Sequence, residues 1–147
     1  MHIVNIVTEI NAETEPDLLQ QIKNNFPQFN VKIFTSGFEG IIGQTDVDKI
    51  YDGCETDEEI NAKLEEIYCE KRLIDFSRLY PEKIFGFIEM DCHGGFCVYG
   101  GVAVKNGETI HAIEAKENGH IDILRQINTN YLGPFFEPFT RKFLGTV

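Results

Sequence analysis

The segment KIFGFIEMDCHGGFCVYGGVAVKNGETIHAIEA, residues 83–115, contains three apolar runs separated by two short joins. The runs cover residues 83–91, 96–104 and 108–115, and the second join holds Asn-Gly, a dipeptide typical of tight β-hairpin turns. Three strands joined in this way predict an antiparallel meander. Because both faces of the first two strands are largely apolar, we expect these strands in the middle of the sheet, with helices covering at least one face.

Upstream of the meander, residues 57–80 are predicted to form one long helix that ends before Pro81. Thr56 and Glu59 match the T-x-x-E capping box found at helix starts. The apolar stripe at helical spacing consists of Ile60, Leu64, Ile67 and Ile74. We expect this stripe to pack against the sheet, with the charged faces of the helix in solvent.

Residues 2–10 and 29–37 are predicted to be strands, with a short helix between them that Pro27 closes. This order favours a parallel pair with a right-handed crossover, and a looser α+β arrangement is the alternative. Glycines interrupt residues 38–55, where we expect a loop with at most a short strand or helical turn. A last helix is predicted over residues 121–132.

Together these elements predict a single α+β domain over residues 1–147. Its expected core is a mixed sheet with a C-terminal antiparallel meander, packed against one long helix and two or three shorter helices. The tail at residues 135–144 holds four phenylalanines, which we expect to pack back onto this core. Packing of the tail on another copy is the alternative, and it would make the chain a structural or oligomeric module.

The charge of the chain restricts its partners. There are 24 Asp and Glu residues against 13 Lys and Arg, which gives a net charge of −11. This charge repels phosphate backbones and anionic lipid, so we expect a basic protein partner and no direct contact with nucleic acid or membrane. The N-terminal apolar run is too short for a secretory signal, and no apolar stretch is long enough to span a bilayer. These features predict a cytoplasmic protein with reduced cysteines.

Reactive side chains are densest in EMDCHGGFC, residues 89–97. Cys92 beside His93 suggests a nucleophile and its base, but neighbours along a strand point to opposite faces. The acidity of Glu89 and Asp91 would also raise the pKa of a nearby thiol. We therefore predict structural thiols here and no catalytic residue.

Metal binding is a second interpretation of the same residues. Cys92, His93 and Cys97 have a spacing at the edge of that seen in zinc sites, while Cys54 and Cys69 are far apart in sequence. If the turn between the strands is tight, Cys92 and Cys97 face one another. The sequence leaves open whether they bind metal or form a disulfide, and we assign neither a metal nor a cofactor.

Glu89 and Asp91 are two residues apart, so they share one face of their strand, and Glu114 or His111 on the third strand can lie near that face. Paired carboxylates can perform acid and base catalysis when burial separates their pKa values. Nothing in the sequence indicates such burial. We expect an acidic rim in solvent, and a small enzyme or ligand-binding protein using residues 89–97 is the alternative.

The pattern E-x-D-x-x-G-G at residues 89–95, followed by an apolar strand, resembles a strand, turn and strand of small uncharacterised bacterial α+β proteins. The resemblance covers about the last half of the chain, and Cys92 stands where that pattern usually has an aromatic residue. In size and acidity the chain is also similar in type to the immunity proteins that neutralise bacterial toxins in the producing cell. This second likeness implies a function and no residue roles.

We therefore expect an acidic cytosolic binding protein, of the immunity or inhibitor kind, that covers a basic toxin domain such as a nuclease. A field of one sign accelerates the encounter with a basic surface, and aromatic anchors then hold it. The residues predicted to bind the partner are Glu65, Glu66, Tyr68, Glu70, Glu89, Asp91 and Tyr99.

Overall fold

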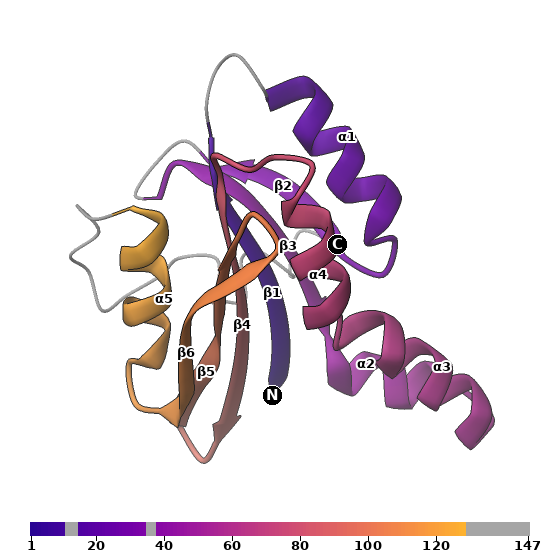
Figure 1. Cartoon of the computed structure of the whole chain (residues 1–147). Coiled ribbons are helices and arrows are strands. Elements are labelled where there is room, and N and C mark those ends of the chain that lie inside the picture. Colours follow the sequence, from indigo (N-terminus) through magenta and orange to yellow (C-terminus); the bar gives the residue numbers. More distant parts are fainter. Residues whose placement is uncertain (11–14, 35–37, 129–147) are drawn as a thin grey trace.

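The computed structural model describes residues 1–10, 15–34 and 38–128, and these form a six-stranded sheet with helices on both faces (Figure 1). The strand order is β2-β3-β1-β4-β5-β6. All neighbouring strands are antiparallel. The strands are β1 His2–Glu9, β2 Asn30–Phe34, β3 Gly40–Asp46, β4 Ile84–His93, β5 Phe96–Lys105 and β6 Glu108–Lys116. The fold is α+β, as the sequence predicts.

Two layers of helix enclose this sheet. The helices are α1 Glu15–Asn25, α2 Val47–Gly53, α3 Asp57–Ile67, α4 Glu70–Ser77 and α5 Gly119–Ile127. Buried residues of α1 to α4 form one core cluster with one sheet face, and α5 forms a second cluster with the opposite face. Figure 1 shows α5 on one side of the sheet and the other helices on the other side. None of the helices in the described ranges has the length and hydropathy needed to cross a bilayer.

The predicted meander is confirmed, with β4, β5 and β6 as consecutive neighbours. Its turns hold Gly94, Gly95, Asn106 and Gly107, all at positive φ, as two-residue hairpin turns require. β4 and β5 lie inside the sheet, and helices α4 and α5 both contact them. The doubly apolar pattern of these two strands therefore predicts their central place in the sheet correctly.

The predicted mixed sheet is wrong, because β3 lies between β1 and β2 and pairs with both in antiparallel register. Residues 38–55, expected to be mostly loop, form β3 and α2. The glycines that hide this strand are points of close approach. A Cβ at Gly40 would lie 2.4 Å from the Thr8 carbonyl oxygen, and one at Gly43 would lie 3.3 Å from Phe29 Cβ.

The predicted helix over residues 57–80 extends from Asp57 to Ser77, with a break at Tyr68 and Cys69 that divides it into α3 and α4. Its start is as predicted, since Thr56 Oγ1 accepts a hydrogen bond from the Glu59 amide at 3.2 Å. The break leaves Tyr68 exposed and Cys69 buried. It therefore places a phenol at the surface between two helices.

The last predicted helix, over residues 121–132, begins two residues earlier, at Gly119, and ends earlier than expected, at Ile127, because Asn128 is already extended. Residues 129–132 lie outside the described residues. Gly86 on β4 provides the space against which this helix packs, because a Cβ there would lie 2.9 Å from Ile123 and from Ile127. The tail at residues 135–144 lies outside the described residues.

Candidate binding groove

One face of β4 changes character along its length. Phe85 and Phe87 are fully buried beneath the helices, at 0% and 1% exposure. Glu89 and Asp91 follow on the same face, and their side chains are 39% and 42% exposed. The strand therefore begins in the core and ends at the floor of an open groove.

The groove is a cavity of about 600 Å³ on the sheet face of β4, β5 and β6, a size typical of ligand sites. Four carboxylates line it: Glu89 and Asp91 from β4, Glu70 from α4 and Glu114 from β6. None of the described lining residues is a lysine or an arginine. The apolar and glycine residues of its lining are Phe87, Val98, Gly100, Gly101, Val102, Ala112, Ile113 and Ala115. We call this cavity the acidic groove.

Glycines keep the floor of the acidic groove hollow. A Cβ at Gly101 would lie only 1.8 Å from the Phe87 carbonyl oxygen. A Cβ at Gly100 would lie 2.9 Å from the Ala115 amide nitrogen. The register between β5 and β6 shifts between Tyr99 and Gly101, which brings the backbones together here. The close backbone approach excludes side chains from the floor and leaves room between the carboxylates.

Two side chains from outside the lining of the acidic groove contact its carboxylate Glu89. His2 Nε2 lies 2.6 Å from Glu89 Oε1, and the Tyr68 hydroxyl donates to the same oxygen at 3.4 Å. The Tyr68 hydroxyl also lies 3.3 Å from His2 Nε2. Burial and the neighbouring Glu89 charge raise the pKa of Tyr68 well above its usual value, so the phenol keeps its proton and stays a donor. Glu89 is thus held in place by two side chains from other elements.

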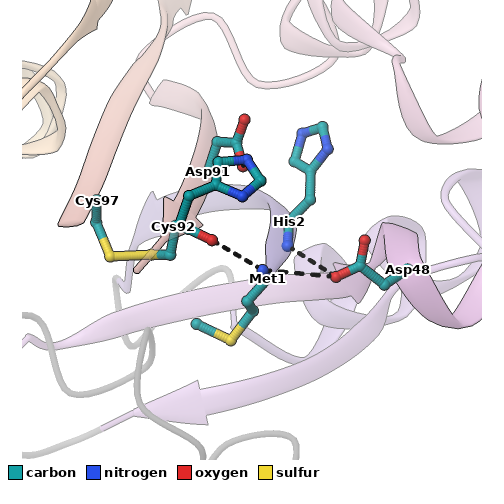
Figure 2. The surroundings of a disulfide bond; sticks show 7 residues. Met1, His2, Asp48, Asp91, Cys92 and Cys97 are labelled. Carbon is teal, nitrogen blue, oxygen red and sulfur yellow. Dashed lines mark hydrogen bonds and ion pairs between the residues drawn. A yellow bond between two sulfur atoms is a disulfide. The ribbon is translucent and has the colours of Figure 1, made fainter. Parts of the chain in front are cut away.

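The hairpin end of β4 and β5 carries a disulfide between Cys92 and Cys97 (Figure 2). Cys92 therefore has no free thiolate in this form and cannot act as a nucleophile. His93, 82% exposed, lies with its Nε2 2.9 Å from Asp91 Oδ1. No group of three or more potential metal ligands occurs within the described ranges. Of metal binding and a disulfide, which the sequence left open, the structure has the disulfide. The expectation of reduced cysteines is therefore wrong for Cys92 and Cys97, because their strand register places the two sulfur atoms within bonding distance.

Figure 2 also shows how this hairpin end meets the start of β1. The Met1 amino group donates to the Cys92 carbonyl oxygen at 2.9 Å, and the Cys92 amide donates to the Met1 carbonyl oxygen at 2.8 Å. The His2 amide donates to Asp48 Oδ2 at 3.3 Å, which adds α2 to the contact. The pairing of the start of β1 with the end of β4 therefore positions both the disulfide and the contact of His2 with Glu89.

Four of the seven residues predicted to bind a partner lie around the acidic groove. Glu70, Glu89 and Asp91 line it, and the Tyr68 hydroxyl donates to Glu89. Glu65 lies in a second hollow of about 740 Å³ between α3 and α4, which Tyr68 and Glu70 also line. Glu70 thus separates two adjoining depressions.

The other two predicted residues lie elsewhere. Glu66 accepts a hydrogen bond from Gln28 Nε2 at 2.8 Å. Tyr99 is on the opposite sheet face, where its ring centroid lies 4.0 Å from that of the buried His120. Burial raises the pKa of Tyr99, in keeping with its place in the second core cluster. Tyr99 therefore points away from the acidic groove.

His2 is the residue of this site that the sequence did not indicate. It reaches Glu89 because β1 pairs with β4, with His2 opposite Asp91. The pairing joins residues 89 positions apart in the chain, and local periodicity carries no information about it. No protein-family model matches this chain, and neither do the curated proteins or the solved structures with which it was compared.

Proposed function

We propose that the chain is an acidic binding protein that covers a basic surface on a protein partner, in the manner of an immunity or inhibitor protein against a basic toxin domain such as a nuclease. One observation carries this proposal. Four carboxylates line one open cavity, and none of its described lining residues is a lysine or an arginine.

The four carboxylates of the acidic groove raise the free energy of the unbound protein. Like charges around one cavity repel, and the effect is strongest where protein walls reduce the local dielectric constant. A partner's lysine or arginine side chains relieve that repulsion on binding. The net charge of −11 also steers a basic partner toward the chain from several ångströms away.

Exposed aromatic side chains beside the acidic groove supply apolar anchors. Tyr68, whose hydroxyl donates to Glu89, is 40% exposed, and Phe96, next to the turn between β4 and β5, is 57% exposed. Phe96 lies on the same face of β5 as Val98, which lines the cavity. Aromatic residues next to charged ones are typical of binding hot spots on proteins. This combination favours a folded basic protein over a small cation as the ligand.

The test compares two charge reversals with the same change in net charge. Basic proteins are captured from extract of the native cells at low salt, and the affinity of each captured protein is measured for wild type, Glu114→Lys and Glu82→Lys. Glu114 lines the acidic groove, and Glu82 is exposed near the opposite end of β4. We expect Glu114→Lys to weaken binding at least tenfold and Glu82→Lys to weaken it only a few-fold, with both affinities decreasing as salt rises.

Other results would contradict the proposal in distinguishable ways. Equal losses in the two variants would mean that total charge attracts the partner and the acidic groove does not hold it. An affinity that does not change with salt concentration would mean that charge does not drive the binding. If no basic protein binds the wild-type chain, the proposed function is wrong.

An enzyme remains the second candidate, and one contact favours it. The 2.6 Å contact between His2 Nε2 and Glu89 Oε1 has the geometry by which a carboxylate orients a catalytic imidazole. This candidate predicts that His2→Gln abolishes turnover of a substrate bound in the acidic groove while leaving its affinity nearly unchanged. A binding protein shows no turnover with either form.

A further inference from the structure

We propose that Cys92 and Cys97 are a reversible dithiol–disulfide pair, which exchanges with small disulfides of the glutathione type and sets how firmly the end of the β4–β5 hairpin is held. This proposal stands apart from the proposed function, because it does not depend on what the acidic groove binds. Four observations support it: the strand register, the short separation of the cysteines, their exposure and their link to β1.

The strand register alone brings the two sulfur atoms together. Cys92 lies directly opposite Cys97, and their Cα atoms are 4.1 Å apart. The backbone amide and carbonyl of Cys92 are both bonded to Met1, so they point away from β5. Cys92 and Cys97 therefore form a non-hydrogen-bonded pair, the kind in which facing side chains come closest. The two thiols meet whenever the hairpin is formed.

The disulfide is not needed to form the hairpin. The cysteines are five positions apart, and the strands that carry them pair over their whole length, from Ile84 with Lys105 to His93 with Phe96. A cross-link that closes so short a loop restricts the unfolded chain much less than one that closes a long loop. We therefore expect the oxidised and the reduced chain to share this fold.

Small disulfides can reach both cysteines of this pair, whereas of the other two cysteines Cys54 is half-buried and Cys69 is buried. Cys92 and Cys97 are half-buried at a hairpin end whose turn residues are exposed. Cys54 and Cys69, the other two cysteines of the chain, are free thiols. Cys69 is 2% exposed, and burial raises its pKa to about 11, so its reactive thiolate is scarce at neutral pH.

Reduction of the disulfide affects the end of β4 that pairs with the start of β1. Cys92 is hydrogen-bonded to Met1. The neighbouring residues, His2 on β1 and Asp91 on β4, lie opposite one another, and this register brings His2 to Glu89. The disulfide joins the last residue pair but one before the turn, at the end of the hairpin where fraying is easiest. Breaking it therefore loosens the hairpin end and the Met1 pairing before any other part of the sheet.

The exchange balances in atoms and electrons. A thiolate of the reduced pair attacks one sulfur of R–S–S–R, forms a mixed disulfide and releases R–S⁻. The second thiolate attacks the protein sulfur of that mixed disulfide, closes the Cys92–Cys97 bond and releases the other R–S⁻. Two electrons pass from the pair to the reagent, and the two thiol protons end on two R–SH molecules.

The first test is a redox titration of the full chain. The protein is equilibrated at varied ratios of reduced to oxidised glutathione, quenched with acid, alkylated and digested with trypsin. Both cysteines lie in the tryptic peptide of residues 84–105. We expect this peptide to change from unlabelled to doubly labelled in one transition, at ratios between those of reducing and oxidising compartments. The Cys54→Ser variant should show the same transition.

Three results would overturn the proposal: a peptide that stays unlabelled in full reductant, one that is labelled at every ratio, or a disulfide that recruits Cys54. The variant Cys97→Ser provides a positive check, because Cys92 should then keep the glutathione of the mixed disulfide. Its mass identifies the intermediate directly.

The second test measures how firmly the hairpin end is held. Hydrogen exchange of the amides at residues 90–98 should be several-fold faster in the reduced chain than in the oxidised chain, while the amides of α5 stay unchanged. The double variant Cys92→Ser, Cys97→Ser should exchange at the reduced rate in either buffer. Equal exchange at residues 90–98 in the two wild-type forms would show that the disulfide does not stabilise the end of the hairpin.

Discussion

The two halves of one face of β4 have opposite environments, although the backbone is the same regular strand. Phe85 lies under helix cover, and Phe87, also buried, is where the lining of the acidic groove begins; Glu89 and Asp91 follow in the groove with half-exposed side chains. The face turned toward α5 shows no such change, since Gly86, Ile88 and Met90 are all buried. The difference lies in what covers the strand.

The helices stop covering this face of β4 because the helical segment of residues 57–77 is interrupted between α3 and α4. α4 packs on β4 and β5, whereas α3 packs on α2 and leads away from the sheet in Figure 1. Tyr68 and Cys69 form the junction between the two helices. A single straight helix through this junction would continue the packing direction of α4. The break therefore accounts for a sheet face that is core at one end and groove at the other.

The largest expected effect lies in the covered half. Phe85→Ala removes a fully buried ring that packs edge-on against Phe76 at 5.5 Å between centroids. We expect the free energy of unfolding to decrease by about 3–5 kcal/mol in urea denaturation, because the change loses buried area and leaves a cavity. Phe96→Ala, at a ring that is 57% exposed, should change it by no more than about 0.5 kcal/mol. Equal effects would mean that the helices do not cover this half.

A smaller loss is expected from the floor of the open half. Gly101→Ala places a methyl group 1.8 Å from the Phe87 carbonyl oxygen, so β4 and β5 must separate. Overpacking of this kind costs about 1–3 kcal/mol, measured by the same denaturation. The matched control is Gly53→Ala, where a Cβ meets nothing within 4 Å, and no loss is expected. A tolerated Gly101→Ala would show that the floor is not closely approached by backbone.

The elements predicted correctly from the sequence are those specified by neighbours in the chain. The meander depends on alternating apolar residues and on turn dipeptides such as Asn106-Gly107, which adopt the required positive φ. The helix start at Thr56 depends on residues within one turn of it. The shared face of Glu89 and Asp91 depends only on the two-residue period of a strand. Of the two residues expected near that face, Glu114 or His111, the structure places Glu114 in the groove, through the pairing of the meander strands.

The elements missed are those specified by residues distant in the chain. Gly40 and Gly43 weaken a local strand pattern, yet a Cβ at Gly40 would clash with the Thr8 carbonyl oxygen and one at Gly43 would be in tight contact with Phe29. The parallel pairing was predicted from the order strand, helix, strand, and β3 changes it by inserting between the two strands. His2 belongs to the groove only through the pairing of β1 with β4.

The smallest expected effect on stability has the opposite sign and distinguishes the groove from an ordinary exposed surface. Glu114→Gln removes one of the four carboxylates of the acidic groove, so the free energy of unfolding should rise by up to about 0.5 kcal/mol at low salt, as repulsion is relieved. The gain should shrink in about 1 M salt, where charges are screened within a few ångströms. Glu82→Gln, outside the groove, is the control and should show a smaller gain. A loss of stability in Glu114→Gln would mean that a cation of the chain already neutralises the groove, and the affinity for a basic partner would then have to come from elsewhere.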